Sequence, residues 1–124
     1  MTTSGIEGLL IETHNWGKTV AFWQALGFVL QFETDHHSGQ LQHPAGGPFL
    51  FVAERPADHE LETYPVVAVD DADAFRQATP VSIDEPFVPQ HWQRMEGFAY
   101  DPDGRRISLQ APLPAGVEAP ARHG

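Results

Sequence analysis

The hydrophobic pattern in the first half of the chain predicts a strand, a helix and three more strands. The apolar run over residues 6–13 is typical of a strand. Asn15 can then accept hydrogen bonds from the first turn of a helix, and apolar side chains recur three and four residues apart until Gly27. Three further β-prone runs follow at residues 28–34, 40–43 and 49–53. The order in this half is therefore β-α-β-β-β.

The second half shows the same order. A β-branched run at residues 64–69 is followed by Asp71, which can cap a short helix over residues 72–78 that ends before Pro80. Strands are then predicted at residues 81–88, 95–100 and 105–110, and a type I turn at residues 101–104 joins the last two. The acidic residues 55–63, between the halves, have no periodicity and are predicted to be a connector.

The two halves align as a structural repeat. Placing Asn15 over Asp71 superposes the helix starts, and Gly47 falls over Gly104 before the final strand of each half. We therefore predict an α+β fold in which two βαβββ modules, at about residues 5–54 and 63–111, pair into one curved mixed sheet. The helices would lie outside and a concave cleft inside. A single domain is expected over residues 1–112, followed by a flexible tail at residues 113–124.

Alternation along the strands predicts which side chains face the helices. One parity is apolar and belongs under the helices; it comprises Leu9, Ile11, Val67, Val69, Ile107 and Leu109. The other parity is mixed and faces the cleft; it comprises Leu10, Glu12, Tyr64, Arg106, Ser108 and Gln110.

Composition narrows the function classes. A chain of 124 residues is the size of one domain, and its formal net charge of −10 disfavours nucleic acid and membrane surfaces as partners. The absence of cysteine excludes disulfides and thiolate metal sites. Because no leader-like or membrane-spanning pattern occurs, we expect a soluble, cytoplasmic protein.

Three stretches resemble the glyoxalase/bleomycin-resistance/dioxygenase (vicinal oxygen chelate) superfamily. They are Thr19-Val20-Ala21-Phe22-Trp23 leading to Leu26-Gly27-Phe28, then Val66-Val67-Ala68-Val69-Asp70-Asp71, and finally Phe98-Ala99-Tyr100-Asp101-Pro102-Asp103-Gly104. The resemblance implies paired βαβββ modules and, for a chain this short, a homodimer with clefts at the interface.

The same resemblance locates a metal position. Enzymes of the superfamily hold a divalent metal with His or Glu on the first and last strand of each module. The repeat register assigns these four positions to Gly8, Phe51, Tyr64 and Ser108, none of which suits a divalent cation. A one-residue slip would add Glu7 as the only potential ligand. We therefore expect no metal, no other cofactor and no catalytic residue.

Aromatic side chains take the place of the metal ligands. The chain looks like the bleomycin-resistance branch, whose small acidic dimers sequester a basic aromatic antibiotic, and Phe32 and Trp92 match the positions that stack on the drug there. Our leading hypothesis is sequestration of an aromatic, cationic antibiotic for self-protection. The predicted ligand contacts are Phe32, Phe49, Phe51, Tyr64, Trp92, Phe98 and Tyr100, with Glu12, Asp35, His37, Glu96 and Ser108 supplying polar groups.

Two alternatives stay open. The first is a superfamily enzyme of the lyase, isomerase or dioxygenase type that acts on a small metabolite, with Glu7, His14 and His43 as unexpected metal ligands or His14 as acid–base. The second is a degenerate domain that binds a protein partner and whose aromatic residues fill the cleft. Nucleophile-elbow, phosphate-loop and zinc-protease motifs are absent from the sequence.

Overall fold

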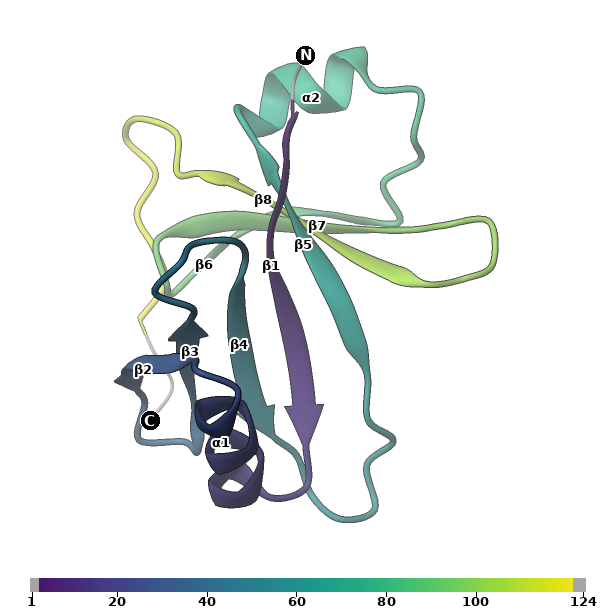
Figure 1. Cartoon of the computed structure of the whole chain (residues 1–124). Coiled ribbons are helices and arrows are strands. Elements are labelled where there is room, and N and C mark those ends of the chain that lie inside the picture. The colour runs from purple at the N-terminus through teal and green to yellow at the C-terminus, as the bar shows by residue number, and fades with distance from the viewer. Residues whose placement is uncertain (1–2, 122–124) are drawn as a thin grey trace. The chain divides into compact units, whose positions relative to one another are not determined.

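The computed structural model describes residues 3–121 and contains two βαβββ modules (Figure 1). The first module consists of β1 (Thr3–Thr13), α1 (Trp16–Ala25), β2 (Val29–Glu33), β3 (Ser38–Gln42) and β4 (Phe49–Glu54). The second module consists of β5 (Thr63–Val69), α2 (Ala72–Ala78), β6 (Glu85–Gln90), β7 (Arg94–Tyr100) and β8 (Arg106–Pro112). The α+β class and the repeated element order predicted from the sequence are confirmed.

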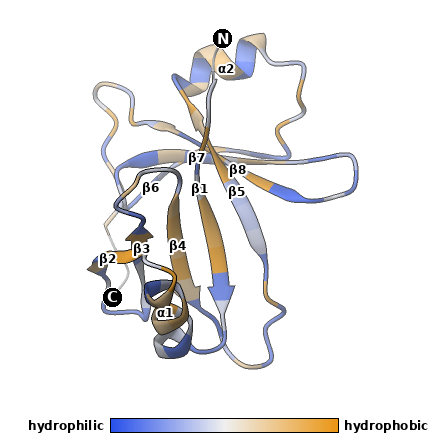
Figure 2. Cartoon of the chain, in the orientation of Figure 1, coloured by the Kyte–Doolittle hydropathy of each residue, from blue (hydrophilic) through white to orange (hydrophobic). Residues whose placement is uncertain are grey.

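The sheet of the first module has the strand order β2-β3-β4-β1. β1 and β4 are parallel, and the other neighbours are antiparallel. Figure 2 shows that β4 and much of β1 are hydrophobic, as expected for strands beneath a helix. Helix α1 packs on β4 and β2, and the core between them consists of Trp16, Val20, Leu41, Leu50 and Val52.

The second module repeats this arrangement with the order β6-β7-β8-β5, in which β5 and β8 are parallel. Helix α2 contacts β8. The core consists of Val69, Ala72, Phe75, Phe87, Ala99, Leu109 and Ala111, with Val67 and Ile107 packed against it. The helix-facing parity predicted from alternation is confirmed in both modules, because Leu9 and Ile11 pack on the first core in the same way.

Both helices begin at the predicted caps. The Asn15 side chain accepts a hydrogen bond from the Lys18 amide (3.0 Å), and Asp71 accepts one from the Ala74 amide (2.8 Å). The first helix has a second acceptor at its start, because Glu54 Oε2 accepts from the Trp16 amide at 2.8 Å.

The outer strand of each module is irregular in the same way. The register of β2 on β3 shifts between Leu30 and Phe32, and that of β6 on β7 shifts between Glu85 and Val88. The shift in β6 lies opposite the buried Gly97, and the shift in β2 lies close to the buried Gly39, which pairs with Glu33. A Cβ on Gly39 would collide with the Phe32 carbonyl oxygen, and one on Gly97 would lie 3.0 Å from the Glu85 carbonyl oxygen.

The two glycines occupy equivalent places in the repeat. Gly39 pairs with Val52 and Gly97 pairs with Leu109. Val52 and Leu109 are separated by 57 residues, the same separation as that between Gly47 and Gly104. Close approach of a bulged outer strand thus explains a glycine at this position in both modules.

Two compact units divide the described chain slightly differently from the modules. Residues 7–65 form one unit, and residues 66–121 together with residues 3–6 form the other. Ser4 Oγ donates to Asp70 Oδ1 (2.8 Å), which ties the start of β1 to the second unit. Within the described residues, no helix is long and apolar enough to cross a bilayer.

Several element boundaries differ from the sequence prediction, including those of β3, which spans Ser38–Gln42 rather than residues 40–43. β1 begins at Thr3 rather than residue 6, β6 begins at Glu85 rather than residue 81, and β8 continues to Pro112. Residues 81–84 leave the sheet because Pro80 ends α2 and Thr79 Oγ1 binds the Val81 amide (3.1 Å), which holds the chain in a turn. Residues 122–124 of the predicted tail lie outside the described residues.

Candidate functional site

Strand pairing confirms the repeat register on the first and last strands of the two modules. Leu10 pairs with Phe51 in the first module, and Val66 pairs with Ser108 in the second. Leu10 and Val66 are 56 residues apart, as Asn15 and Asp71 are, and Phe51 and Ser108 are 57 apart, as Gly47 and Gly104 are. The predicted first-strand positions, Gly8 and Tyr64, lie two residues earlier on the same faces.

These residues do not fit a divalent metal. None of the predicted positions, Gly8, Phe51, Tyr64 and Ser108, has the imidazole or carboxylate that a divalent metal requires at such a site, and the paired Leu10 and Val66 have no donor atom in their side chains. Across residues 3–121, no group of three or more His, Asp or Glu is placed to hold a metal ion. The donor set therefore argues against the metal-dependent chemistry of the superfamily.

The first module has an open sheet face, on the side away from α1, that is rich in aromatic rings. Phe32 is 49% exposed, and its ring centroid lies 6.4 Å from that of Phe51. The Phe49 ring lies against Gly8 so closely that a Cβ there would collide with it. The shared face that alternation predicts for Phe49 and Phe51 follows from their pairing with Gly8 and Leu10.

Three glutamines form a hydrogen-bonded chain on β2 and β3. Gln42 Nε2 donates to the Gly47 carbonyl oxygen (2.9 Å), Gln31 Nε2 donates to Gln42 Oε1 (3.1 Å), and Gln40 Nε2 donates to Gln31 Oε1 (2.7 Å). Gln40 pairs with Phe32 on one side and Phe51 on the other. We call Gln31, Gln40 and Gln42 the glutamine chain.

The corresponding open face of the second module surrounds a buried carboxylate. Glu96 is 7% exposed, and its Oε2 accepts hydrogen bonds from Ser108 Oγ (2.6 Å) and Gln110 Nε2 (3.2 Å). Burial raises the pKa of Glu96, while the hydrogen bonds from Ser108 and Gln110 and the charge of Arg106 partly oppose the rise. The carboxylate is thus costly to ionise and held in place by its neighbours.

Trp92 extends this network to the edge of the sheet. Its ring is 44% exposed, and Nε1 donates to Gln110 Oε1 at 3.2 Å. Gln110 Nε2 also contacts Ser108 Oγ at 3.1 Å. Three predicted ligand contacts, Trp92, Glu96 and Ser108, are therefore joined through Gln110.

On the same face, the side chain of Arg106 lies over the ring of Phe98. The Arg106 guanidinium lies 3.9 Å from the centroid of the Phe98 ring and 3.3 Å from Glu85 Oε2. Tyr100 donates its hydroxyl proton to the same Glu85 oxygen (2.9 Å). Phe98 and Tyr100 thus share a small cluster with Arg106 and Glu85, two charged residues that were not predicted as site residues.

Three more predicted polar contacts, Glu12, Asp35 and His37, lie in the first module. Glu12 accepts from Arg55 Nε (2.7 Å) and from the Glu62 amide (2.9 Å), so it anchors the connector that follows β4. Asp35 and His37 lie in the turn between β2 and β3 and are exposed. Tyr64, at the start of β5, is buried.

The residues of the enzyme alternative are dispersed. His14 Nε2 lies 2.8 Å from the His59 carbonyl oxygen, and His43 Nδ1 accepts from the Ala45 amide (3.1 Å). Glu7 lies on β1. Each histidine is thus engaged with local backbone.

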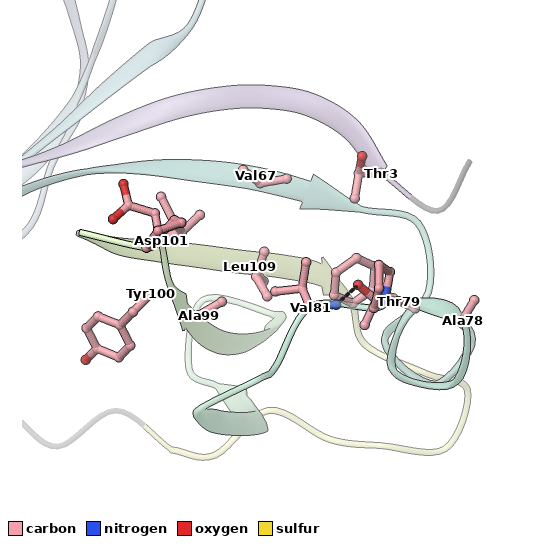
Figure 3. A pocket seen from close by; sticks show the side chains of 13 residues that line it. Thr3, Val67, Ala78, Thr79, Val81, Ala99, Tyr100, Asp101 and Leu109 are labelled. Atoms are coloured by element: carbon pink, nitrogen blue, oxygen red, sulfur yellow. Dashed lines mark hydrogen bonds between the residues drawn. The ribbon is translucent and has the colours of Figure 1, made fainter. Parts of the chain in front are cut away.

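A separate hollow of about 780 Å³ lies on the helix side of the second module (Figure 3). Its walls come from α2, the segment that follows α2, and the helix-facing side of the sheet, and they include Val67, Phe75, Val81, Ile107 and Leu109. Tyr100 is the one predicted ligand contact among its lining residues. The walls are mostly apolar, so this hollow differs in chemistry from both open faces.

Sequence reasoning missed the glutamine chain and the role of Gln110. The signal was present, because Gln40 and Gln42 alternate on one strand, and alternation had already placed Arg106 and Gln110 on the cleft side. The hydrogen bonds between Gln31 and Gln40 and between Gln110 and Glu96 depend on the cross-strand register, which the sequence pattern does not give.

Comparison with known proteins gives one similar sequence and many similar folds. No family model matches the chain. An uncharacterized protein of Mycolicibacterium smegmatis (strain ATCC 700084 / mc(2)155) is 25% identical over 119 residues, which cover 91% of this chain and 98% of that protein.

Solved structures share the fold at low sequence identity. A glyoxalase/bleomycin resistance protein/dioxygenase superfamily member from Vibrio splendidus 12B01 aligns with a TM-score of 0.63 and 15% identity, covering 90% of this chain and all (100%) of that one. Methylmalonyl-CoA epimerase from Mycobacterium tuberculosis aligns with a TM-score of 0.68 and 16% identity, covering 91% of each chain.

Proposed function

Starting from the fold of the glyoxalase/bleomycin resistance/dioxygenase superfamily, which this chain has, we propose that the protein binds a small aromatic, cationic molecule without transforming it. The observation behind the proposal is that the four expected metal positions, Gly8, Phe51, Tyr64 and Ser108, carry no imidazole or carboxylate, and neither do Leu10 and Val66, which pair with Phe51 and Ser108. A protein that binds a molecule without transforming it can only sequester it. Sequestration protects a cell when the bound molecule is toxic, so we propose an antibiotic as the ligand.

Exposed rings on the open face of the first module support an aromatic ligand. Phe32 leaves about half of its surface in solvent (49%), and Phe51 lies 6.4 Å away at a tilt of 53°. An aromatic guest can gain both apolar burial and ring–ring contact on such a surface. Trp92 offers a similarly exposed indole in the second module.

The charge distribution supports a cationic ligand. The formal net charge is −10, and the second module's open face has two carboxyl groups, those of the buried Glu96 and of Glu85, which pairs with Arg106. Arg106 lies over the Phe98 ring, so this face already contains a cation stacked on an aromatic ring. A guest cation would use the same physical interaction.

A calorimetric titration against bleomycin-type and other cationic DNA-damaging antibiotics tests the proposal. We expect at least one of them to bind, and Phe32→Leu to weaken its affinity about tenfold because a stacking surface is lost. Phe22→Leu is the matched control, since Phe22 is 60% exposed on α1, outside the open face. The proposal fails if no compound binds or if the two variants weaken binding equally.

We extend the proposal to a homodimer. The first module exposes apolar side chains at the end of α1 and on the adjacent strand, where Leu26 is 54% and Val29 is 52% exposed. Burying such a patch is a common reason for self-association. Light scattering coupled to size exclusion should give twice the mass of 13.7 kDa, and a monomer at micromolar concentration would refute this part.

A second candidate function is acid–base catalysis on a small metabolite. The observation that favours it is Glu96, whose burial raises its pKa as catalytic acids and bases require. Methylmalonyl-CoA, the substrate named in one of the similar structures, is a suitable first test compound. Deuterium incorporation from D₂O into its α-position, lost in Glu96→Gln, would favour this candidate, whereas no incorporation would favour sequestration.

A further inference from the structure

Each open face contains a series of hydrogen-bonded side chains. In each series, one group that can only accept or only donate determines how the neighbouring amides are oriented. In the first module the Gly47 carbonyl can only accept, so Gln42 must turn Nε2 toward it. Gln42 Oε1 is then the acceptor for Gln31, and Gln31 Oε1 is the acceptor for Gln40. The orientation of all three amides follows from one backbone oxygen.

The free end of the glutamine chain is an acceptor. Gln40 donates to Gln31, and no described residue donates to Gln40 Oε1. Because Gln40 pairs with Phe32 and Phe51, this oxygen belongs to the strand position between the two rings. The first open face therefore combines an aromatic surface with a hydrogen-bond acceptor.

In the second module the orientation of the side chains is fixed by a donor, the Trp92 indole, rather than by an acceptor. The Trp92 indole can only donate, so Gln110 must present Oε1 to it and Nε2 to Glu96 and Ser108. Since Ser108 Oγ receives a hydrogen bond from Gln110, its own proton is directed to Glu96 Oε2. Both of these donors end on Oε2, and no residue in the described chain donates to Glu96 Oε1.

We propose that each open face selects its ligand through one acceptor, Gln40 Oε1 on the first and Glu96 Oε1 on the second, which takes hydrogen bonds from the N–H groups of an aromatic cation such as an amidinium, guanidinium or aminoheterocycle. This inference rests on the proposed binding function. A ligand that offers only acceptors meets lone pairs on either face, and a quaternary ammonium ion supplies charge but no donor.

A matched pair of probes separates charge from hydrogen bonding. Benzamidine and phenyltrimethylammonium are both aromatic cations of similar size, but only benzamidine has N–H groups. In titrations followed by ¹H–¹⁵N NMR, the unmodified protein should bind benzamidine about tenfold or more tightly than phenyltrimethylammonium, the effect expected for a hydrogen bond to a charged acceptor.

Two substitutions then test the acceptors. In Glu96→Gln the amide oxygen can take over the bonds from Ser108 and Gln110, which leaves an NH₂ group in place of Oε1, so the preference for benzamidine should disappear at the second face while the first face keeps it. Asp73→Asn removes the same charge from exposed α2 and should keep the preference. Gln40→Met should reduce the preference, whereas Gln24→Met, an exposed change on α1, should leave it unaltered.

The outcomes distinguish this inference from the function on which it rests. If the protein binds both probes equally, or if Glu96→Gln and Gln40→Met keep the preference for benzamidine, the acceptor assignment is wrong while binding of aromatic cations stands. If neither probe nor any cationic antibiotic binds, the proposed function fails and the inference fails with it.

Discussion

The two modules share a scaffold but differ on the faces that their helices leave open. Both pair their first and last strands in parallel, begin their helix at a side-chain cap, and place a glycine beneath a bulged outer strand. The first open face has Phe32, Phe51 and neutral amides, whereas the second has Glu96, Arg106 and Ser108. Core positions thus preserve the repeat, and the open faces diverged in chemistry.

The helix sides differ in how completely they are covered. Helix α1 spans 10 residues and α2 spans 7. At about 1.5 Å per residue, α2 is shorter by roughly 4–5 Å. The hollow of about 780 Å³ lies beside this shorter helix, so the second module has less packing on its helix side.

Among the substitutions that compare the two modules, those of Gly39 and Gly97 should change the free energy of unfolding most. Gly39→Ala should lower the free energy of unfolding by about 3 kcal/mol, because the new Cβ meets the Phe32 backbone and the Trp16 ring. Gly97→Ala should cost about half as much, roughly 1.5 kcal/mol, since its closest contact would be 3.0 Å from the Glu85 carbonyl.

Urea denaturation measures both values, with Gly17→Ala on α1 as the control. A Cβ there would meet nothing closer than Asn15 Oδ1 at 3.9 Å, so no loss is expected. Equal costs at residues 39 and 97 would show that the two bulges are equally adaptable and would remove this difference between the modules.

The helix caps should show the next largest effect. Asp71→Ala should cost about 1.5 kcal/mol, while Asn15→Ala should cost about 0.5 kcal/mol, because Glu54 still accepts from the first amide of α1. Thermal unfolding of both variants gives the comparison. A larger loss for Asn15→Ala would mean that Glu54 does not contribute to capping.

A smaller effect is expected from the pH dependence of Glu96. Its pKa is raised in the folded state, so the folded chain retains a proton that the unfolded chain releases. The stability of the unmodified protein should therefore fall, relative to Glu96→Gln, as pH rises from the ordinary glutamate pKa through the raised one.

Urea midpoints at a series of pH values test this sign. Because all other titrating groups are common to both proteins, their difference isolates Glu96. A difference that does not change with pH, or one that grows in favour of the unmodified protein, would contradict the assignment of burial as the dominant cause.

The smallest expected effect concerns the arginine that distinguishes the second face. Arg106→Gln should lower stability by about 0.5 kcal/mol, since it removes the contact with Phe98 and the pairing with Glu85 at a partly exposed site. The loss should shrink in high salt. Chemical denaturation at two salt concentrations measures both, and a loss above 2 kcal/mol would mean that Arg106 is structural.

Local patterns were sufficient to predict the scaffold. Asn15 and Asp71 fix the helix starts, and alternation fixes the faces, because both depend on residues close together in the sequence. The start of β6 was misplaced because Val81 is β-prone, yet the preceding Thr79 and Pro80 hold it in a turn. Here turn chemistry outweighed strand propensity.

The candidate site was less predictable because it depends on cross-strand register. Phe32 and Phe51 were chosen for their ring type, but their proximity follows from the pairing of each with Gln40. The amide orientation of Gln110 follows from Trp92, 18 residues earlier. No local pattern contains such information, whereas strand pairing determines it directly.

The bulged outer strands also bear on how the molecule avoids unwanted assembly. A regular edge strand can add a strand from another chain and begin aggregation, and bulges and prolines interrupt that process. β2 has its register shift, and β6 combines a shift with Pro86 and Pro89, which donate no backbone hydrogen bond. Growth by sheet extension is therefore obstructed at the outer strand of each module, and self-association there has to rely on side chains.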